Sequence, residues 1–275
     1  MTDVPPPDLF TRRVCLRREG MDRVPVRRDI PYGRPTDDGR VMDAYYPSGA
    51  TDGGWPVVVI VVGYPGTLEP RPTPLRYKET GWAVSMAPLI ASSGMVAVAY
   101  TNREPVADLR ALLEHLREHA ASLGIDAARV GIMAVSGNVP TALTTILRTT
   151  ERPPACAVFG YGCLLDLDGA TDVADASRRF GFVNACAGLT VVDLRRDVPI
   201  CISRAGRDQF PAMNASIDRF VAKALVENVP LTLVNHAEGP HGFDLFDDSR
   251  TSRDIVRQTL RFLQQHLTSE AQASG

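Results

Sequence analysis

Cysteine is scarce in this 275-residue sequence. There are 5 cysteines, none of them in a C-x-x-C pair, and the odd number excludes a framework in which every cysteine is disulfide-bonded. No cluster of histidine and cysteine has the spacing of metal ligands. We therefore expect reduced cysteines, no metal and no cofactor. The cysteines are Cys15, Cys156, Cys163, Cys186 and Cys201.

Long apolar runs and an excess of one charge are also missing. The first residues, MTDVPPPDLFTRR, lack the apolar core of about 7 to 15 residues of a secretory signal, and no run reaches the roughly 18 residues of a membrane span. We therefore expect a soluble, cytoplasmic protein without a membrane partner. The 30 basic and 32 acidic residues give a net charge of -2, which provides no electrostatic case for binding nucleic acid. A small neutral molecule is the more natural ligand.

What is present is an alternation of apolar strands with amphipathic helices. With 44% hydrophobic residues the chain can bury one large core, so we expect a single domain over residues 1–275. Three strands before residue 47 should be antiparallel at one sheet edge. Later strands and helices alternate, which predicts an α/β fold with a mostly parallel sheet and helices on both faces. The predicted strands are 14–16, 24–30, 41–46, 55–62, 95–100, 130–135, 155–159, 199–204 and 231–234, and the predicted helices are 82–90, 106–123, 139–147, 213–226 and 252–267.

Residues 160–197 interrupt this alternation. The segment is too long for an ordinary loop and must have structure of its own. It leaves the carboxyl end of a strand, where open α/β sheets bind their ligands. We interpret it as a small cap or lid that contributes to substrate selection. The alternatives are an inert insertion or a contact between the copies of a homo-oligomer.

Ser136 lies at the point where an apolar strand changes into a helical pattern. A serine on such a turn has its hydroxyl exposed beside the free N–H groups of a helix N-terminus, which suits a nucleophile for acyl transfer. The usual pattern of this turn is G-x-S-x-G, but here Ala134 and Asn138 replace both outer glycines. Both are small, so the turn stays feasible. The alternative is that Ser136 only caps the helix.

A serine nucleophile needs a base, and the base needs an acid that orients it. Asp208 and His241 each follow a different predicted strand, so both should lie at the same sheet edge as Ser136. Asp208 could instead cap the helix beginning near residue 213, and Asp218 or Asp244 could be the acid. His236 is the rival base, but it ends a strand, where a core or edge histidine is the simpler interpretation.

The order serine, acid, histidine beyond successive strands resembles the α/β-hydrolase superfamily. The segments AVSGN, RAGRD and HGF, within residues 41–267, make the chain similar to its dienelactone-hydrolase and small-esterase branch. The resemblance implies an α/β-hydrolase fold with a small cap insertion. Dienelactone hydrolases carry a cysteine nucleophile at the elbow, so Ser136 favours an esterase.

The oxyanion of the tetrahedral intermediate also needs donors, usually the N–H after the nucleophile and one from the loop after the third strand. Here they would be the backbone N–H groups of Gly137 and Tyr64, because Pro65 has none. Tyr64 could instead be only a pocket wall.

Taken together, these residues predict a serine hydrolase that cleaves a small carboxylic ester through an acyl-enzyme intermediate. The same fold could instead host an amidase, a lactonase or an acyltransferase. A non-catalytic binding protein is the other alternative, and the altered elbow glycines and the GYPG loop are its only support.

Overall fold

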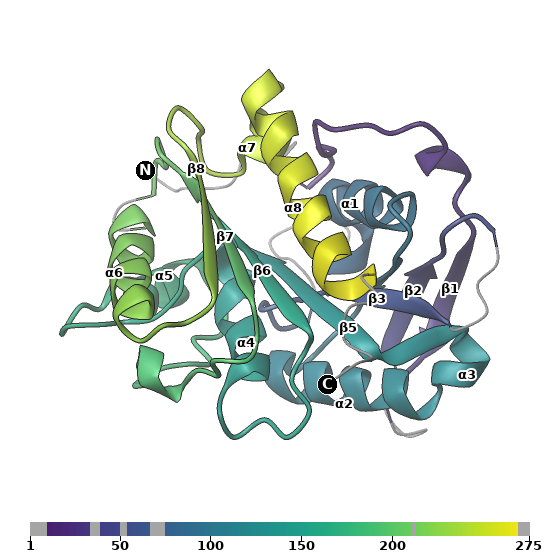
Figure 1. Ribbon diagram of the computed structural model, residues 1–275, viewed down its shortest axis with the longest axis horizontal. Helices are drawn as coiled ribbons and strands as arrows, with labels where there is room; N and C mark the ends of the chain where they lie inside the picture. Colours follow the sequence, from purple (N-terminus) through teal and green to yellow (C-terminus); the bar gives the residue numbers. More distant parts are fainter. Residues whose placement is uncertain (1–9, 34–38, 50–53, 67–74, 211–212, 269–275) are drawn as a thin grey trace.

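The computed structural model describes residues 10–33, 39–49, 54–66, 75–210 and 213–268. Its centre is an eight-stranded sheet with the order β1-β2-β4-β3-β5-β6-β7-β8 (Figure 1). The strands are β1 Val26–Pro31, β2 Val41–Tyr45, β3 Trp55–Ile60, β4 Val96–Tyr100, β5 Ile125–Val135, β6 Cys156–Gly160, β7 Ile200–Ala205 and β8 Leu231–His236. The helices are α1 Gly81–Ala91, α2 Pro105–Glu118, α3 Ala120–Leu123, α4 Val139–Leu143, α5 Asp172–Phe180, α6 Met213–Val226, α7 Phe243–Phe246 and α8 Arg250–Thr268. Short 3-10 turns are η1 Met21–Arg23, η2 Tyr77–Glu79, η3 Ser136–Asn138, η4 Thr144–Ile146 and η5 Val191–Asp193.

The predicted mostly parallel sheet is confirmed. Strand β2 pairs antiparallel with both β1 and β4, whereas every pair from β4 through β3, β5, β6 and β7 to β8 is parallel. The carboxyl ends of these parallel strands therefore lie at one edge of the sheet. The loops that follow β3, β5, β6, β7 and β8 all leave the sheet at that edge.

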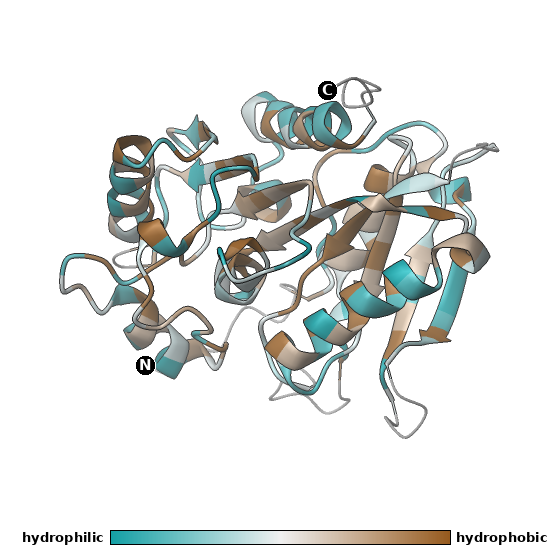
Figure 2. Ribbon diagram, turned by 60° about the horizontal axis from the view of Figure 1, so that its bottom comes forward, coloured by the Kyte–Doolittle hydropathy of each residue, from teal (hydrophilic) through white to brown (hydrophobic). Residues whose placement is uncertain are grey.

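Helices cover both faces of the sheet, as predicted. Successive side chains of a strand point to opposite faces, so Val57 and Val59 belong to the core cluster that contains residues of α2, α4 and α6, whereas Val58 and Ile60 belong to the cluster that contains residues of α1 and α8. Figure 1 shows α1 and α8 together on one side of the strands and α2 and α4 on the other. In Figure 2 the strands are mainly brown between helices that carry teal on their outer sides. Burial on both faces explains the continuous apolar runs of the central strands.

The predicted strand at residues 14–16 is wrong. Val14 and Leu16 are buried, but the segment runs along α1 and the Val14 N–H donates to the Ser85 hydroxyl at 2.9 Å. The antiparallel edge consequently holds two strands before β4 rather than three. The sequence pattern identified burial correctly and assigned it to the wrong partner.

Two predicted helices are shorter or broken. The helix after Ser136 consists of η3, α4 and η4, and the helix predicted at 106–123 is interrupted at His119 between α2 and α3. The segment at 160–197 has structure of its own, as predicted, in the form of α5 and η5. Within the described ranges, no helix combines the length and the apolar character that crossing a membrane requires.

Candidate active site

Ser136 directly follows β5 and opens the short turn η3. Its φ of 55° lies in the left-handed region, which a residue other than glycine rarely adopts. Such a conformation costs about 1 to 3 kcal/mol and persists only where the surroundings enforce it. The strain turns the Ser136 side chain away from the sheet, as a nucleophile elbow requires.

The structure brings Ser136, His241 and Asp208 into contact. Ser136 Oγ lies 2.9 Å from His241 Nε2, and His241 Nδ1 lies 2.7 Å from Asp208 Oδ2. The Asp208 side chain is 0% exposed and the His241 side chain 12%. An ionised carboxylate only accepts hydrogen bonds, so Nδ1 carries the proton and Nε2 is left as an acceptor for the serine hydroxyl. This arrangement can remove a proton from Ser136.

Asp208 is itself fixed from a second side. Its other carboxylate oxygen, Oδ1, accepts the backbone N–H of Phe210 at 2.9 Å. The backbone N–H of His241 donates to the Gln209 side-chain oxygen at 3.1 Å. Hydrogen bonds therefore connect the loop after β7 to the loop after β8 at the site.

The rival residues lie elsewhere. Asp218 forms an ion pair with Arg204, and Asp244 accepts hydrogen bonds from Trp82 and Tyr161. Neither contacts His241 Nδ1, whose acidic partner is Asp208. His236 is buried and its Nε2 lies 3.0 Å from both Asp247 Oδ2 and Ser252 Oγ, so it is the core histidine that the sequence suggested.

Glycines from neighbouring strand ends make room for the elbow. A Cβ atom on Gly63 would stand 2.7 Å from the Gly137 carbonyl oxygen, and one on Gly162 would stand 2.3 Å from the Val139 side chain. Asn138, in the position of the second elbow glycine, is buried and its side-chain oxygen accepts the Gly63 N–H at 2.8 Å. Its amide nitrogen donates to the Tyr77 hydroxyl at 2.9 Å. The missing elbow glycines are therefore compensated from outside the motif.

Tyr64 lies against the backbone just after the nucleophile. A Cβ atom on Gly137 would stand 2.6 Å from the Tyr64 hydroxyl oxygen and 2.5 Å from the Phe182 ring. Burial raises the pKa of this phenol above its ordinary value, so it keeps its proton at neutral pH. Tyr64 thus presents a donor next to Ser136.

Two aromatic side chains with no motif of their own flank the His241 ring. The Tyr161 ring centroid lies 5.0 Å away at an interplanar angle of 72°, and the Phe210 centroid 4.6 Å away at 88°. Tyr161 directly follows β6 and Phe210 lies in the loop after β7. Their position just beyond strand ends is the signal that could have identified them from the sequence.

The segment between β6 and β7 packs directly on the site. Phe182 contacts the Tyr64 ring at a centroid distance of 6.0 Å, and the Val183 N–H donates to the Gly63 carbonyl at 2.9 Å. Cys186 Sγ lies 3.2 Å from the carbonyl oxygen of Pro140 in α4, the helix that follows Ser136. This segment therefore forms one wall beside Gly137. In the part of the chain that the structure describes, no group of three or more potential metal ligands occurs.

Comparison with known proteins identifies the fold. The sequence matches no family model and no curated protein. A thermophilic esterase of Thermogutta terrifontis is similar in structure, with a TM-score of 0.66, 17% identity and coverage of 92% of this chain and 96% of that one. Another structure shows esterase 2 of that species phosphonylated by sarin. The esterase LipW of Mycobacterium marinum has a TM-score of 0.68 at 16% identity, covering 90% and 83%. A bacterial heroin esterase has a TM-score of 0.64 at 17% identity, covering 90% and 84%. This chain therefore has the α/β-hydrolase fold.

Proposed function

We propose that this protein is a serine hydrolase that cleaves a small carboxylic ester, with Ser136, His241 and Asp208 as its catalytic residues. One observation carries the proposal: Ser136 and Asp208 contact opposite nitrogens of one imidazole, and the serine stands on a left-handed elbow. That geometry has little use in a helix cap. The names of the structurally similar proteins, which are esterases, support the same reaction class.

In the proposed mechanism, Ser136 Oγ attacks the ester carbon while His241 Nε2 takes the hydroxyl proton. Asp208 keeps the imidazole oriented and stabilises its charged form. When the tetrahedral intermediate collapses, the bond to the alkoxy oxygen breaks and His241 returns the proton to the leaving alcohol. A water molecule, deprotonated by His241, then attacks the acyl carbon; the bond from that carbon to Ser136 Oγ breaks, the carboxylic acid leaves, and His241 returns the proton to Ser136 Oγ.

The oxyanion is bound by the Gly137 N–H and by the side-chain hydroxyl of Tyr64. The closeness of that hydroxyl to the Gly137 backbone supports the side chain as the second donor, in place of the Tyr64 N–H expected from the sequence. The raised pKa of the buried phenol supports it too, because only a protonated phenol donates. A donor aimed at the developing charge contributes most in such a dry site.

Residues 160–197 act as a cap within a single hydrolase domain. The contacts of Phe182 with Tyr64 and Gly137 support a role in limiting the size of the bound ester. We retain similarity to the dienelactone-hydrolase branch, a cytoplasmic location and homo-oligomerisation as proposals that rest on the sequence. An amidase, lactonase or acyltransferase would use the same three residues.

The decisive experiment is labelling of the purified protein with a fluorophosphonate, followed by mass spectrometry of the modified peptide. We expect modification of Ser136 alone and none in Ser136→Ala. Hydrolysis of p-nitrophenyl esters, amides and lactones then separates the reactions. A folded wild type that neither reacts with the probe nor turns over any of these substrates would contradict the proposal and favour a binding protein.

The Tyr64 donor is tested by Tyr64→Phe, which removes the hydroxyl and keeps both the ring and the backbone N–H. We expect kcat to fall by about 10²-fold, as for the loss of one oxyanion donor elsewhere. An unchanged kcat would show that the hydroxyl is not the second oxyanion donor and would favour the backbone N–H of Tyr64 instead.

A further inference from the structure

Tyr161 has an unusual backbone at the carboxyl end of β6. Its φ of 32° lies in the left-handed region, although it is a bulky residue and not a glycine. Its N–H donates to the Ser203 carbonyl at 2.6 Å, and its side chain is buried. Strained conformations of this kind concentrate at functional sites, where the surroundings over-determine them.

A chain of buried hydrogen bonds ends at this tyrosine. Trp82 Nε1 on α1 donates to Asp244 Oδ2 at 2.7 Å, and the Tyr161 hydroxyl donates to Asp244 Oδ1 at 2.7 Å. The backbone carbonyl of Asp244 also accepts the Cys15 N–H at 2.7 Å. Burial raises the pKa of the Tyr161 phenol well above its usual range, so the phenol stays a donor. Asp244 is therefore anchored on three sides and holds Tyr161 by its hydroxyl.

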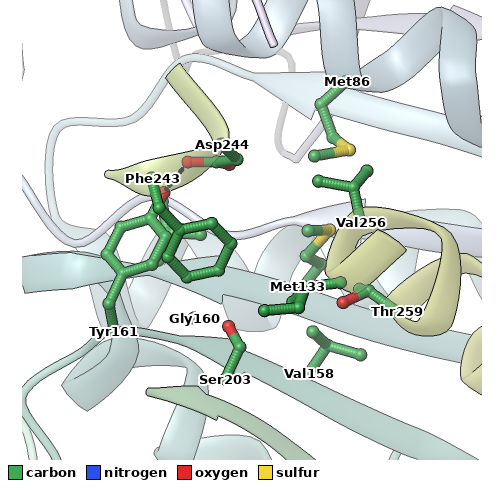
Figure 3. Close-up of a pocket in the computed structure, with 12 residues that line it drawn as sticks. Met86, Met133, Val158, Gly160, Tyr161, Ser203, Phe243, Asp244, Val256 and Thr259 are labelled. Atoms are coloured by element: carbon green, nitrogen blue, oxygen red, sulfur yellow. Dashed lines mark hydrogen bonds between the residues drawn. The ribbon is translucent and has the colours of Figure 1, made fainter. Parts of the chain in front are cut away.

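A small cavity lies beside Tyr161. It has a volume of about 20 Å³ and also adjoins Asp244, on the α1 and α8 side of the sheet. Figure 3 shows Tyr161, Phe243 and Asp244 at one end of it, with Met86 and Val256 at the other. His241 does not line this cavity. The hydrogen bond to Asp244 therefore holds the Tyr161 hydroxyl at the edge of this cavity.

We propose that Tyr161, pinned by Asp244 and Trp82, is a positioning residue that keeps the His241 imidazole aligned between Ser136 and Asp208. The inference rests on the proposed function and extends it to residues outside the proposed catalytic triad. The imidazole must stay in place while it moves a proton from Ser136 to the leaving alcohol. The perpendicular rings of Tyr161 and Phe210 restrict its rotation, and of the two only Tyr161 is tied to the core through a buried carboxylate.

The test is Tyr161→Phe, which removes only the hydroxyl. With p-nitrophenyl acetate we expect kcat to fall about tenfold at an unchanged KM, because a small misplacement of a catalytic group slows the reaction without weakening substrate binding. The rate of fluorophosphonate reaction at Ser136 should fall by the same factor. Asp244→Asn leaves only one acceptor oxygen for the two hydrogen bonds from Tyr161 and Trp82, so it should also lower kcat. This variant provides the test if Tyr161→Phe does not fold.

Tyr32→Phe is the matched control. Tyr32 is also buried and its hydroxyl also donates a hydrogen bond, to the Thr101 carbonyl, but it makes no contact with His241. Both variants should lose a similar amount of thermal stability, and only Tyr161→Phe should lose kcat. Equal loss of kcat in both, a wild-type kcat in a folded Tyr161→Phe, or a change confined to KM would overturn the inference. Failure of wild-type labelling would instead refute the proposed function itself.

Discussion

His241 and His236 each lie within hydrogen-bond distance of a serine and an aspartate, but the two groups are built differently. His241 contacts Ser136 through Nε2 and Asp208 through Nδ1. His236 contacts both Ser252 and Asp247 through Nε2, while its Nδ1 is buried without a partner among the described residues. Only in the first arrangement can the imidazole accept the serine proton on one nitrogen while an aspartate orients and stabilises the ring from the other nitrogen.

The two serines differ just as much. Ser136 stands on a left-handed turn at the sheet edge, whereas Ser252 lies in the first turn of α8 and is fully buried. The Ser252 hydroxyl also donates to Asp247 Oδ2 at 2.8 Å, so its proton already binds a carboxylate. The presence of serine, histidine and aspartate therefore does not make a hydrolase site. Such a site requires an acid on the imidazole nitrogen opposite the serine and a serine hydroxyl that a substrate can reach.

The largest expected effect separates the serines. Ser136→Ala should lower kcat by about 10⁴-fold or more, because no other hydroxyl can form the acyl-enzyme. Ser252→Ala should leave kcat unchanged and lower the free energy of unfolding by about 1 to 3 kcal/mol, because it removes a buried hydroxyl that hydrogen-bonds to the Asp247 carboxylate and to His236. Ester hydrolysis and urea unfolding measure the two effects. Loss of activity in Ser252→Ala at unchanged stability would break the comparison.

The aspartates provide the next contrast. Asp208→Asn should reduce kcat by roughly 10⁴-fold, since an amide at this position favours the wrong imidazole tautomer, as in other serine hydrolases. Asp247→Asn should retain the wild-type kcat and weaken the hydrogen bond between residue 247 and His236. Steady-state kinetics of both purified variants with one ester decide the matter. Similar kcat values in the two would remove Asp208 from the proposed triad.

The sequence predicted the sheet and the positions of Ser136, Asp208 and His241 because these depend on local patterns and on the rule that parallel strands end at one edge. Residues 14–16 show where local patterns fail. Their apolar side chains fit a strand, but β1 and β2 already complete that edge, and the segment is buried along α1 instead. Periodicity reveals burial and does not name the partner.

The rest of the site depends on contacts between distant segments. The elbow lacks both outer glycines of its usual pattern, and the space comes from Gly63 and Gly162 in the loops after β3 and β6, which no single motif could show. The sequence indicates Asp244 only as an alternative acid, because no residue near it in the sequence points to Trp82 or Tyr161 as partners. The left-handed backbone of Tyr161 likewise has no signal in its residue type.

A smaller effect, on the pH dependence of stability, distinguishes Asp244 from Asp247, which lies three residues further along the sequence. Burial opposes ionisation of Asp247, but hydrogen bonds from Ser249, Ser252 and His236 hold its pKa below 3.8. Burial dominates at Asp244 and raises its pKa above 3.8, against the donors Tyr161 and Trp82. The two carboxylates should therefore affect stability with opposite dependence on pH.

The direction in which stability changes with pH follows from the difference between the folded and the unfolded pKa of each carboxyl group. The stabilisation from Asp247 is complete above its unfolded pKa of about 3.8 and is lost as pH falls through the lower folded pKa, so the stability deficit of Asp247→Asn should shrink as pH falls below about 3.8. The contribution of Asp244 is largest below about 3.8 and is lost as pH rises through its raised folded pKa, so wild type should lose stability relative to Asp244→Asn from about pH 4 upward. Urea unfolding of wild type and both variants between about pH 3 and pH 8 gives the two difference curves. Slopes of the same sign would mean that the hydrogen bonds from Tyr161 and Trp82 outweigh burial, which would make Asp244 a permanent buried charge that holds the Tyr161 hydroxyl.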